Sequence, residues 1–364
     1  MNIGIDARLI AETGVGRYIR NLIEQLGKLD TENTYVIFLR RKSFDSFVLP
    51  NSRWRKQLAE VAWHTVSEQF VMPKLFGDAK LDLVHIPYHN PPIFYLGRMV
   101  ITIHDLTILH FNTGKATTLP PFIYALKRLG YWVELAVGLR RAHAVISVSE
   151  TTKEEIITHF AVPASKIHVT YEGVDAKLMH DKTNTKSLAP LRNGKYFLYV
   201  GNAYPHKNLN MLIAGFAKYR GPCKLVLVGA EDYFYRRLKL LVESLGLSNR
   251  VEFFGSANDD ELHSLYRTAE ALVFPSLMEG FGLPALEALA LGSRVLCSDI
   301  PIFHEILKEN ATYMDSTDPD EIAKSLTVIS AKKTKSIHSD QFAKYSWEYM
   351  ARETKKIYES STRL

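Results

Sequence analysis

The stretch at residues 271–299 constrains the fold most, because its pattern predicts a strand, a loop, a helix and a second strand in direct succession. Residues 271–274 are a short apolar run that stops at Pro275, which is typical of a buried parallel strand. Pro284 stands where a helix can begin, because proline lacks an N–H that the first helical turn leaves unpaired anyway. Strong helix formers follow until Gly292, which favours a helix end. This succession predicts an open α/β sheet.

The loop of this unit suits ligand binding. Gly280 and Gly282 let the backbone approach a ligand closely. The amides of the first helical turn and the positive end of the helix dipole favour a phosphate or a hydroxyl-rich ligand. We expect Glu279 in the loop and Glu287 on the first turn of the helix, so that both carboxylates face one crevice and bind vicinal hydroxyls of a sugar or a ribose. Either glutamate alone is equally well explained as an ordinary surface or helix-terminal acid.

Length and composition are those of a two-domain globular protein. The chain has 364 residues, of which 46% are apolar and 23% charged. The two cysteines, Cys223 and Cys297, lie in apolar runs, so we expect no disulfide framework and a reducing, cytoplasmic compartment. Charge comes too early in the N-terminal segment for a signal peptide. No apolar stretch approaches the roughly 20 residues that a membrane span needs.

The net charge of +6 favours anionic partners. Basic residues alternate with aromatic and apolar ones in the first half, above all in residues 119–142, which contain Lys127, Arg128, Arg140 and Arg141. Such a mixture suits peripheral contact with an anionic membrane at its inner face. A solvated charged face beside a core helix explains any single cluster equally well. We expect no nucleic acid partner, because no recognition motif accompanies the charge.

Alternating strand and helix patterns predict two doubly wound parallel sheets in tandem. The strands expected in the first domain are residues 3–6, 35–39, 83–86, 99–103, 144–149 and 166–172. Those expected in the second are residues 196–200, 224–228, 251–254, 271–274 and 294–298. The polar residues 177–195 are the best linker candidate.

Two further patterns suggest a cofactor or a metal but fit neither well. Gly14 and Gly16 begin a dinucleotide-type fingerprint, but Ile19 occupies the place of its third glycine. Asp318 and Asp320 have a spacing that some enzymes use for a divalent ion, yet a helix cap explains them better. Cys and His pairs at zinc spacing are absent from the sequence. We therefore expect no cofactor and no metal site.

Histidines follow two of the predicted strands. A histidine at the carboxyl end of a parallel strand faces the ligand crevice more often than the core, which makes His104 a candidate. For His85 and His89 a structural role is favoured. Lys207 lies just past another predicted strand, where its ammonium could neutralise a diphosphate.

Five motifs together resemble the retaining glycosyltransferases of family four. They are TGVGRY from residue 13, the His-Asp pair at 104–105, YEGVD from residue 171, PHKN from residue 205, and EGFGLPALEALALG from residue 279. The resemblance implies a GT-B fold, which has two Rossmann-like doubly wound domains facing across a cleft. It places the acceptor-side domain at residues 1–180 and the nucleotide-sugar domain at 195–340. A C-terminal helix at about 341–364 is expected to pack back on the first domain.

The resemblance also implies residue roles, with His104 and Glu279 as catalytic residues at the transferred sugar. The implied donor-binding residues are Gly14, Gly16, Asn202, His206, Lys207, Gly280, Phe281, Gly282, Leu283 and Glu287. Glu287 is expected at the ribose hydroxyls and Lys207 at the diphosphate. Many family members have an arginine where this chain has Asn202. Either His206 supplies that second contact here, or the diphosphate is held by Lys207 and backbone amides.

The PHKN variant looks most like bacterial mannosyltransferases that build surface polysaccharides. The expected reaction moves mannose from GDP-mannose, by an α linkage, onto a hydroxyl of a glycan or lipid-linked acceptor. A UDP-hexose is the nearest alternative donor. A nucleotide-sugar epimerase of the same fold would convert the donor without an acceptor. A non-catalytic, membrane-associated assembly subunit is the third alternative, against which the presence of Glu279, Glu287, Lys207 and His104 argues.

Overall fold

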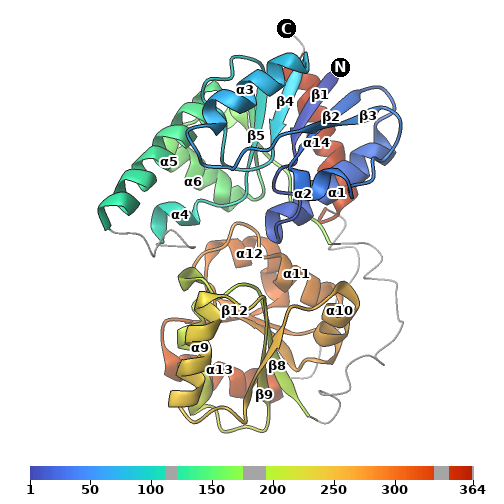
Figure 1. Cartoon of the computed structure of the whole chain (residues 1–364). Coiled ribbons are helices and arrows are strands. Elements are labelled where there is room, and N and C mark those ends of the chain that lie inside the picture. The colour runs from blue at the N-terminus through green and yellow to red at the C-terminus, as the bar shows by residue number, and fades with distance from the viewer. Residues whose placement is uncertain (112–120, 175–193, 332–343, 363–364) are drawn as a thin grey trace. The chain divides into compact units, whose positions relative to one another are not determined.

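The structure is a computed structural model that describes residues 1–111, 121–174, 194–331 and 344–362, with only the backbone of Pro121 and Tyr124. The chain forms two compact units (Figure 1). The described residues of unit 1 lie within Met1–Leu109, Thr118–Gly173 and Lys344–Leu364, and those of unit 2 within His110–Thr117 and Val174–Ala343. Apart from its last two residues, the predicted linker lies outside the described part.

Unit 1 is built on a seven-stranded sheet of order β3-β2-β1-β4-β5-β6-β7, with every neighbouring pair parallel. Its strands are β1 Asn2–Asp6, β2 Thr34–Leu39, β3 Trp54–Leu58, β4 Leu83–Ile86, β5 Met99–Ile103, β6 Ala144–Ser147 and β7 Ile167–Val169. The helices of this part of the chain are α1 Gly14–Leu29, α2 Arg41–Phe44, α3 Glu68–Asp78, α4 Thr107–His110, α5 Pro121–Arg141, α6 Glu150–Phe160, the short η2 Ala164–Lys166, and α14 Trp347–Thr362.

Unit 2 has a six-stranded parallel sheet of order β10-β9-β8-β11-β12-β13. Its strands are β8 Tyr196–Val200, β9 Lys224–Val228, β10 Val251–Gly255, β11 Ala271–Phe274, β12 Val295–Ser298 and β13 Thr312–Met314. Its helices are η5 Pro205–Lys207, α8 Leu209–Lys218, α9 Tyr233–Ser244, α10 Asp259–Thr268, α11 Leu283–Ala290, α12 Pro301–Leu307, η6 Lys308–Asn310 and α13 Pro319–Ala331.

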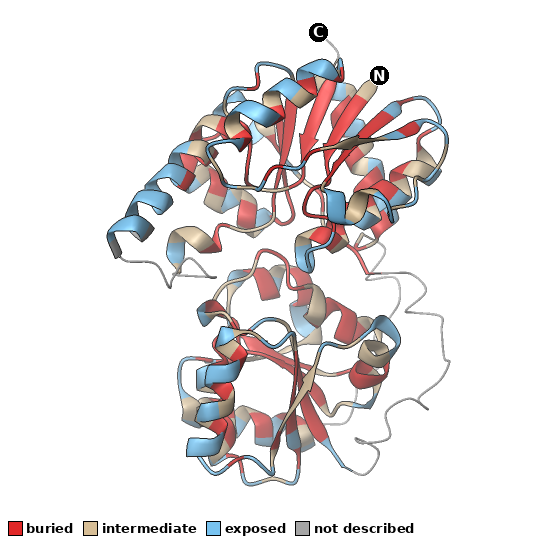
Figure 2. Cartoon of the chain, in the orientation of Figure 1, coloured by how far each residue is buried: buried red, intermediate tan, exposed pale blue. Residues whose placement is uncertain are grey.

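The inner strands form the core of each unit, and they are almost entirely buried, whereas the edge strands are less so (Figure 2). All residues of β4, β5, β6, β11 and β12 are buried. Helices cover both faces of a doubly wound parallel sheet, which explains why these strands are mostly apolar. The predicted α/β class and the doubly wound parallel sheets are confirmed.

Two strands were missed by the sequence prediction. β3 has the sequence WRKQL, in which Trp54 alone is buried, because β3 lies at the edge of its sheet. Its charged residues led to the interpretation of this segment as part of a basic surface. β13, at the edge of the other sheet, is only three residues long. Cys223 directly precedes β9 and Cys297 lies in β12, and both cysteines are free and buried.

The C-terminal helix α14 packs back on unit 1, where it contacts α1 and β4. Its Tyr358 is fully buried, and its hydroxyl lies 2.6 Å from Nδ1 of His85. The other ring nitrogen of His85 lies 2.7 Å from Oγ1 of Thr102 on β5. Burial lowers the pKa of His85 to about 3, so this ring is neutral at ordinary pH. The structural role expected for His85 is confirmed.

Asp30, which ends α1, carries a buried carboxylate that is satisfied by hydrogen bonds. It accepts from the Tyr35 hydroxyl at 2.6 Å, from the Asn33 side chain at 2.6 Å, and from two backbone amides. Burial alone would raise the pKa of this carboxyl, but the hydrogen bonds outweigh burial and lower the pKa to about 2. The ionised carboxylate therefore stabilises the fold.

We expect Asp30→Asn to lower the free energy of unfolding by about 2 kcal/mol at pH 7. Because the folded-state pKa lies below the ordinary value, this contribution is fully present above about pH 5 and is lost as the pH falls from about 4 to 2. Urea titrations of both proteins at pH 7 and pH 3 measure the difference in their free energies of unfolding. We expect this difference to be smaller at pH 3. Asp78→Asn, at an exposed position at the end of α3, serves as control. A difference that is the same at both pH values contradicts the assignment.

Candidate functional site

In unit 2 the neighbouring strands β8 and β11 mark the point where the strand order reverses. From β8 the chain continues through β9 to β10 on one side, and β11, β12 and β13 lie on the other. Loops at the carboxyl ends of two such strands diverge and leave a crevice, which is where open α/β sheets bind ligands. The loop after β8 leads into η5, and the loop after β11 leads into α11. These two loops form the candidate site of unit 2.

The loop after β8 depends on residues in the left-handed region. Gly201 has φ +148°, and its carbonyl accepts a hydrogen bond from the Tyr235 hydroxyl at 2.7 Å. Asn208 has φ +59° and precedes α8, and its side chain donates to the Ser316 carbonyl at 2.7 Å. Hydrogen bonds to Tyr235 and Ser316 thus fix both ends of the turn, and they fix the position of Lys207 between them.

The loop after β11 ends at Gly282, which has φ +90° and caps α11. A Cβ at this position would lie 2.9 Å from the Phe303 ring, so both conformation and space call for glycine. Leu283 and Pro284 are the first two residues of the helix. The first-turn amides of a helix have no acceptor within that helix. They therefore offer donors, at the positive end of the helix dipole, to an anionic ligand.

An ion pair joins the two loops. Nζ of Lys207 lies 2.6 Å from Oε1 of Glu279, and the two side chains are 14% and 10% exposed. The loops are also joined through the backbone, because the Leu277 amide donates to the His206 carbonyl at 2.8 Å. The Lys207 ammonium lies 5.8 Å from the centre of the Phe274 ring. A ligand could replace this ion pair. Lys207 would then bind a phosphate, and Glu279 would bind a sugar hydroxyl.

Glu287 is not on the first turn of the helix, as predicted, but is the fifth residue of α11. Its side chain is nearly buried, at 3% exposure, and its Oε2 accepts a hydrogen bond from the Tyr266 hydroxyl on α10 at 3.1 Å. The helix was expected to begin at Pro284, but it begins one residue earlier, at Leu283, so Glu287 lies beyond its first turn. The two carboxylates therefore have different environments. Glu287 is buried and hydrogen-bonded to Tyr266 of α10, whereas Glu279 forms an ion pair with Lys207.

The other predicted donor residues of unit 2 lie in the same two loops. Asn202 is exposed, and its side-chain oxygen accepts a hydrogen bond from the Tyr204 amide at 3.2 Å. His206 is buried, at 8% exposure, within η5. Phe281 is also buried, so that only its backbone is available to a ligand at the surface.

In unit 1 the corresponding reversal lies between β1 and β4. Gly14 and Gly16, which begin the dinucleotide-type fingerprint, lie in the first turn of α1. A Cβ on Gly16 would lie 2.7 Å from the Ile10 carbonyl oxygen and 2.9 Å from that of Leu9. This glycine therefore lets the start of the helix pack against the preceding turn. From the sequence alone, a glycine required for such packing looks the same as one required for phosphate binding.

His104 follows β5 and is held on both of its ring nitrogens. Nδ1 lies 2.8 Å from Oε1 of Glu172, and Nε2 lies 3.1 Å from the carbonyl oxygen of Pro87. The Tyr18 ring meets the imidazole edge-on, with 4.8 Å between ring centres. Glu172 was not predicted as the partner of His104. The available signal was its place in the YEGVD motif, at the end of a predicted strand.

The predicted site residues thus form two groups, one on each unit. Unit 2 brings together Asn202, His206, Lys207 and the segment from Glu279 to Glu287, while Gly14, Gly16 and His104 lie in unit 1. The Asp318 and Asp320 pattern is a helix start, as predicted. Oδ1 of Asp318 accepts from the Asp320 amide at 2.8 Å, at the beginning of α13, and Asp320 forms an ion pair with Lys218.

Two models of known families match the chain. The model described as Glycosyltransferase Family 4 matches residues 13–178, and the model described as Glycosyl transferases group 1 matches residues 181–347. Together they span nearly the whole chain.

Similar proteins include two O-antigen mannosyltransferases. The O-antigen chain mannosyltransferase RfbU of Salmonella typhimurium is 29% identical over 274 residues, which cover 74% of this chain and 71% of that protein. The O-antigen chain mannosyltransferase B of Escherichia coli is 26% identical over 384 residues, which cover 95% of this chain and 96% of that protein. Sucrose-phosphate synthase of Thermosynechococcus elongatus has a TM-score of 0.81 at 19% identity, covering 99% of this chain and 98% of that one. The chain therefore belongs to the group 1, family four glycosyltransferases, enzymes of GT-B fold that transfer a sugar from a nucleotide sugar to an acceptor.

Proposed function

We propose that this enzyme is a retaining mannosyltransferase. It moves mannose from GDP-mannose onto a hydroxyl of a glycan or lipid-linked acceptor and forms an α linkage. The observation that carries the proposal is the close pair of Lys207 and Glu279 at the strand-order reversal of unit 2, because one side chain suits a diphosphate and the other sugar hydroxyls. The similarity to two O-antigen mannosyltransferases supports mannose as the transferred sugar.

In the proposed complex the Lys207–Glu279 pair opens around the donor. The ammonium of Lys207 binds the diphosphate, and the carboxylate of Glu279, with the backbone at Gly280, Phe281, Gly282 and Leu283, binds the mannose hydroxyls. Asn202 and His206 complete the diphosphate site, and Glu287 binds the ribose. The proposal also assigns a catalytic role to His104 of unit 1, and it assigns Gly14 and Gly16 to donor binding.

The proposed step breaks the bond between mannose C1 and the diphosphate oxygen, and it forms a bond between C1 and the acceptor oxygen on the same face. The proton of the acceptor hydroxyl passes to the leaving diphosphate. Lys207 and the first-turn amides of α11 stabilise the negative charge that builds up on the diphosphate. No metal ion enters this step.

Product analysis tests the proposal. Purified enzyme is incubated with GDP-mannose and with methyl glycosides of mannose, glucose, galactose and N-acetylglucosamine, and the products are examined by NMR. We expect a new α-mannosidic anomeric signal that depends on the presence of a glycoside. A β-linked product, or conversion of the donor sugar without any acceptor, contradicts the proposal, and the second result indicates an epimerase. The same incubation with UDP-glucose tests the alternative donor.

We further propose that α5 brings the enzyme to an anionic membrane. The described side chains of residues 122–130 are all exposed, and the large apolar ones among them are Phe122, Ile123, Leu126 and Leu129. In the part of the chain that the structure describes, no helix is long and apolar enough to cross a membrane. Exposed apolar side chains next to basic ones are typical of a helix that lies at a membrane surface.

The four basic residues of α5 are not equivalent. The guanidinium groups of Arg128 and Arg141 donate hydrogen bonds to backbone carbonyls, to Leu109 in the first case and to Ile93 and Tyr95 in the second. Lys127 and Arg140 are exposed, and they are the better candidates for lipid headgroups.

Replacing Lys127 and Arg140 together by glutamate is expected to weaken binding to phosphatidylglycerol liposomes at least about tenfold, since each basic residue near an anionic surface contributes about 1 kcal/mol. Co-sedimentation at low salt measures the effect. The matched control carries Lys324→Glu and Lys356→Glu, which change the net charge equally at exposed positions on α13 and α14. Equal binding of wild type and the α5 variant removes the membrane proposal.

A further inference from the structure

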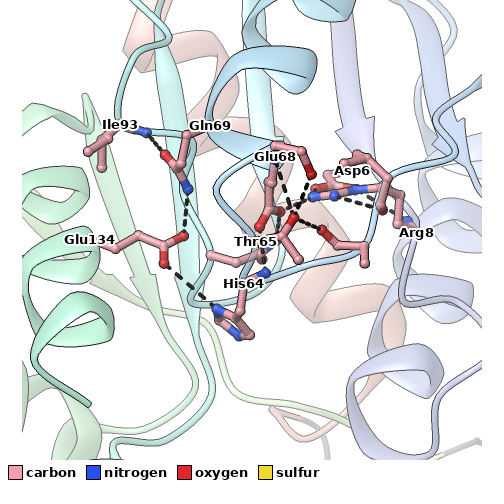
Figure 3. Close-up of polar contacts among 12 residues, drawn as sticks. Asp6, Arg8, His64, Thr65, Glu68, Gln69, Ile93 and Glu134 are labelled. Atoms are coloured by element: carbon pink, nitrogen blue, oxygen red, sulfur yellow. Dashed lines mark hydrogen bonds and ion pairs between the residues drawn. The ribbon is translucent and has the colours of Figure 1, made fainter. Parts of the chain in front are cut away.

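A second polar cluster of unit 1 lies at the carboxyl edge of its sheet, beside the strand-order reversal between β1 and β4 (Figure 3). Asp6 and Arg8 lie at the end of β1, and Asn90 follows β4. Glu68 begins α3, after the loop that leaves β3. This edge is where a doubly wound sheet offers its loops to ligands.

The centre of the cluster is a buried ion network. Arg8 is paired with Asp6 at 2.6 Å and with Glu68 at 2.5 Å, and all three side chains are at most 5% exposed. Asn90 donates to Glu68 at 2.6 Å. Buried ion pairs contribute little net stability, because desolvation offsets their attraction. The network is better explained as a device that fixes the conformation of the neighbouring backbone.

The network fixes the loop before α3. Arg8 donates to the Val61 carbonyl at 3.3 Å, and the second oxygen of Glu68 accepts from the backbone amide of His64 at 2.6 Å. His64 has φ +55°, a conformation that is uncommon and strained for a residue other than glycine. Strain of this kind persists where the surroundings enforce it, and it is concentrated at functional sites.

The enforced backbone presents the His64 ring at the surface beside a fixed carboxylate. The side chain is 32% exposed, and its Nδ1 lies 3.8 Å from Oε2 of Glu134 on α5. The other oxygen of Glu134 accepts from the Gln69 side chain at 3.0 Å, and Gln69 in turn accepts from the Ile93 amide at 2.7 Å (Figure 3). At 3.8 Å this contact is longer than a hydrogen bond, and the carboxylate acts as a nearby negative charge that favours a proton on Nδ1.

Aromatic rings surround His64. Its imidazole stacks on His89 with 5.5 Å between ring centres, and it meets the Tyr131 ring at 5.8 Å and the Tyr88 ring at 6.0 Å. Nδ1 of His89 and the Tyr131 hydroxyl have no hydrogen-bond partner among the residues that the structure describes. Such groups call for a partner, which a ligand hydroxyl or a water beside His64 would supply. Aromatic faces with a few fixed polar groups are typical of small-molecule sites.

We infer that His64 binds a hydroxyl of the sugar acceptor through Nε2, and that Glu134 is the positioning residue that orients its ring. The inference rests on the proposed transferase function and extends it, because it assigns acceptor recognition to a particular side chain of unit 1. In the inferred complex Nε2 accepts the hydroxyl proton in a hydrogen bond, and the Tyr88 ring, which is half-buried where His89 and Tyr131 are buried, offers an apolar face to a pyranose. No covalent step is assigned to His64.

The test uses His64→Gly, because glycine adopts a positive φ without strain. If the ring had only a structural role, glycine would preserve the turn and leave acceptor binding unchanged. We expect instead that the melting temperature is unchanged or higher, while the KM for the preferred methyl glycoside rises at least about tenfold. The affinity for GDP-mannose should stay within about twofold of wild type. Glu134→Gln should raise the same KM by a smaller factor, and His143→Asn, exposed at the start of β6, is the control.

Binding of the methyl glycosides to unliganded enzyme, followed by saturation-transfer NMR, separates this inference from the proposed function. A glycoside signal in wild type that is lost in His64→Gly supports the inference even if GDP-mannose proves to be the wrong donor. Wild-type acceptor KM in His64→Gly overturns it, as does an equal loss of donor and acceptor affinity. It is also overturned if wild type binds none of the four glycosides.

Discussion

Glu279→Gln is expected to lower kcat by about 10²–10³-fold, which corresponds to about 3–4 kcal/mol of lost transition-state stabilisation. The amide keeps the size of the side chain but loses the charge that orients the mannose hydroxyls in the proposed complex. The substitution also removes the partner of Lys207, whose side chain is only 14% exposed. The variant is therefore also expected to be less stable without substrate. Its kcat must be compared with its melting temperature.

The matched control for this variant lies at the other end of the same strand. Glu270 precedes β11 and pairs with Arg294 at 2.5 Å, at a similar burial of 17% and 15%. Glu270→Gln should reduce the melting temperature about as much as Glu279→Gln, but it should leave kcat unchanged. If both variants lose activity in parallel with stability, Glu279 has a structural role only. Wild-type turnover in Glu279→Gln excludes it from the site.

Lys207→Met is expected to lower kcat by about 10²–10³-fold as well, because it removes the cation that faces the departing diphosphate. Methionine has the length of the lysine stem without its charge, so the packing beside Phe274 is kept. We also expect weaker binding of GDP, since the ammonium would contact the diphosphate before and after transfer. Steady-state kinetics and calorimetric titration with GDP measure the two effects.

The control for Lys207 is a second substitution at the same place. Lys207→Arg keeps the charge and should recover part of the activity, although a guanidinium differs from an ammonium in shape. Lys207→Met and Glu279→Gln combined should have an effect far smaller than the product of the two single effects, because each single change leaves an unpaired partner. Strictly multiplicative effects would contradict a shared site.

Much of the fold could be predicted from the sequence because buried parallel strands are continuously apolar. β4, β5, β8, β9 and β11 have the expected bounds. The edge strands β3 and β13 were missed, since an edge strand needs fewer apolar residues and β3 carries charges that are also typical of a surface loop. A hydrophobic pattern predicts that a segment is buried. It therefore identifies a strand only where the strand is buried.

The candidate site was predictable only where a motif keeps its residues close in sequence. The segment from Glu279 to Gly282 is continuous, so its glycine-containing loop could be expected from the sequence. The contact between His104 and Glu172 joins segments 68 residues apart, and the one between Arg8 and Glu68 joins segments 60 residues apart. His64 adopts its left-handed conformation where its amide donates to Glu68, the residue that this second contact joins to Arg8. Only the folded chain shows these pairs.

The most direct test of the proposed function is a thermal-shift comparison of GDP-mannose, GDP, UDP-glucose, UDP-N-acetylglucosamine and UDP. A ligand at about 100 times its Kd adds about 2.7 kcal/mol to the free energy of unfolding, which raises the melting temperature by several degrees. We predict such a shift with GDP and GDP-mannose and none with the uridine nucleotides. A shift with uridine nucleotides alone would contradict GDP-mannose as the donor. The absence of a shift with every nucleotide would contradict donor binding and favour a non-catalytic subunit.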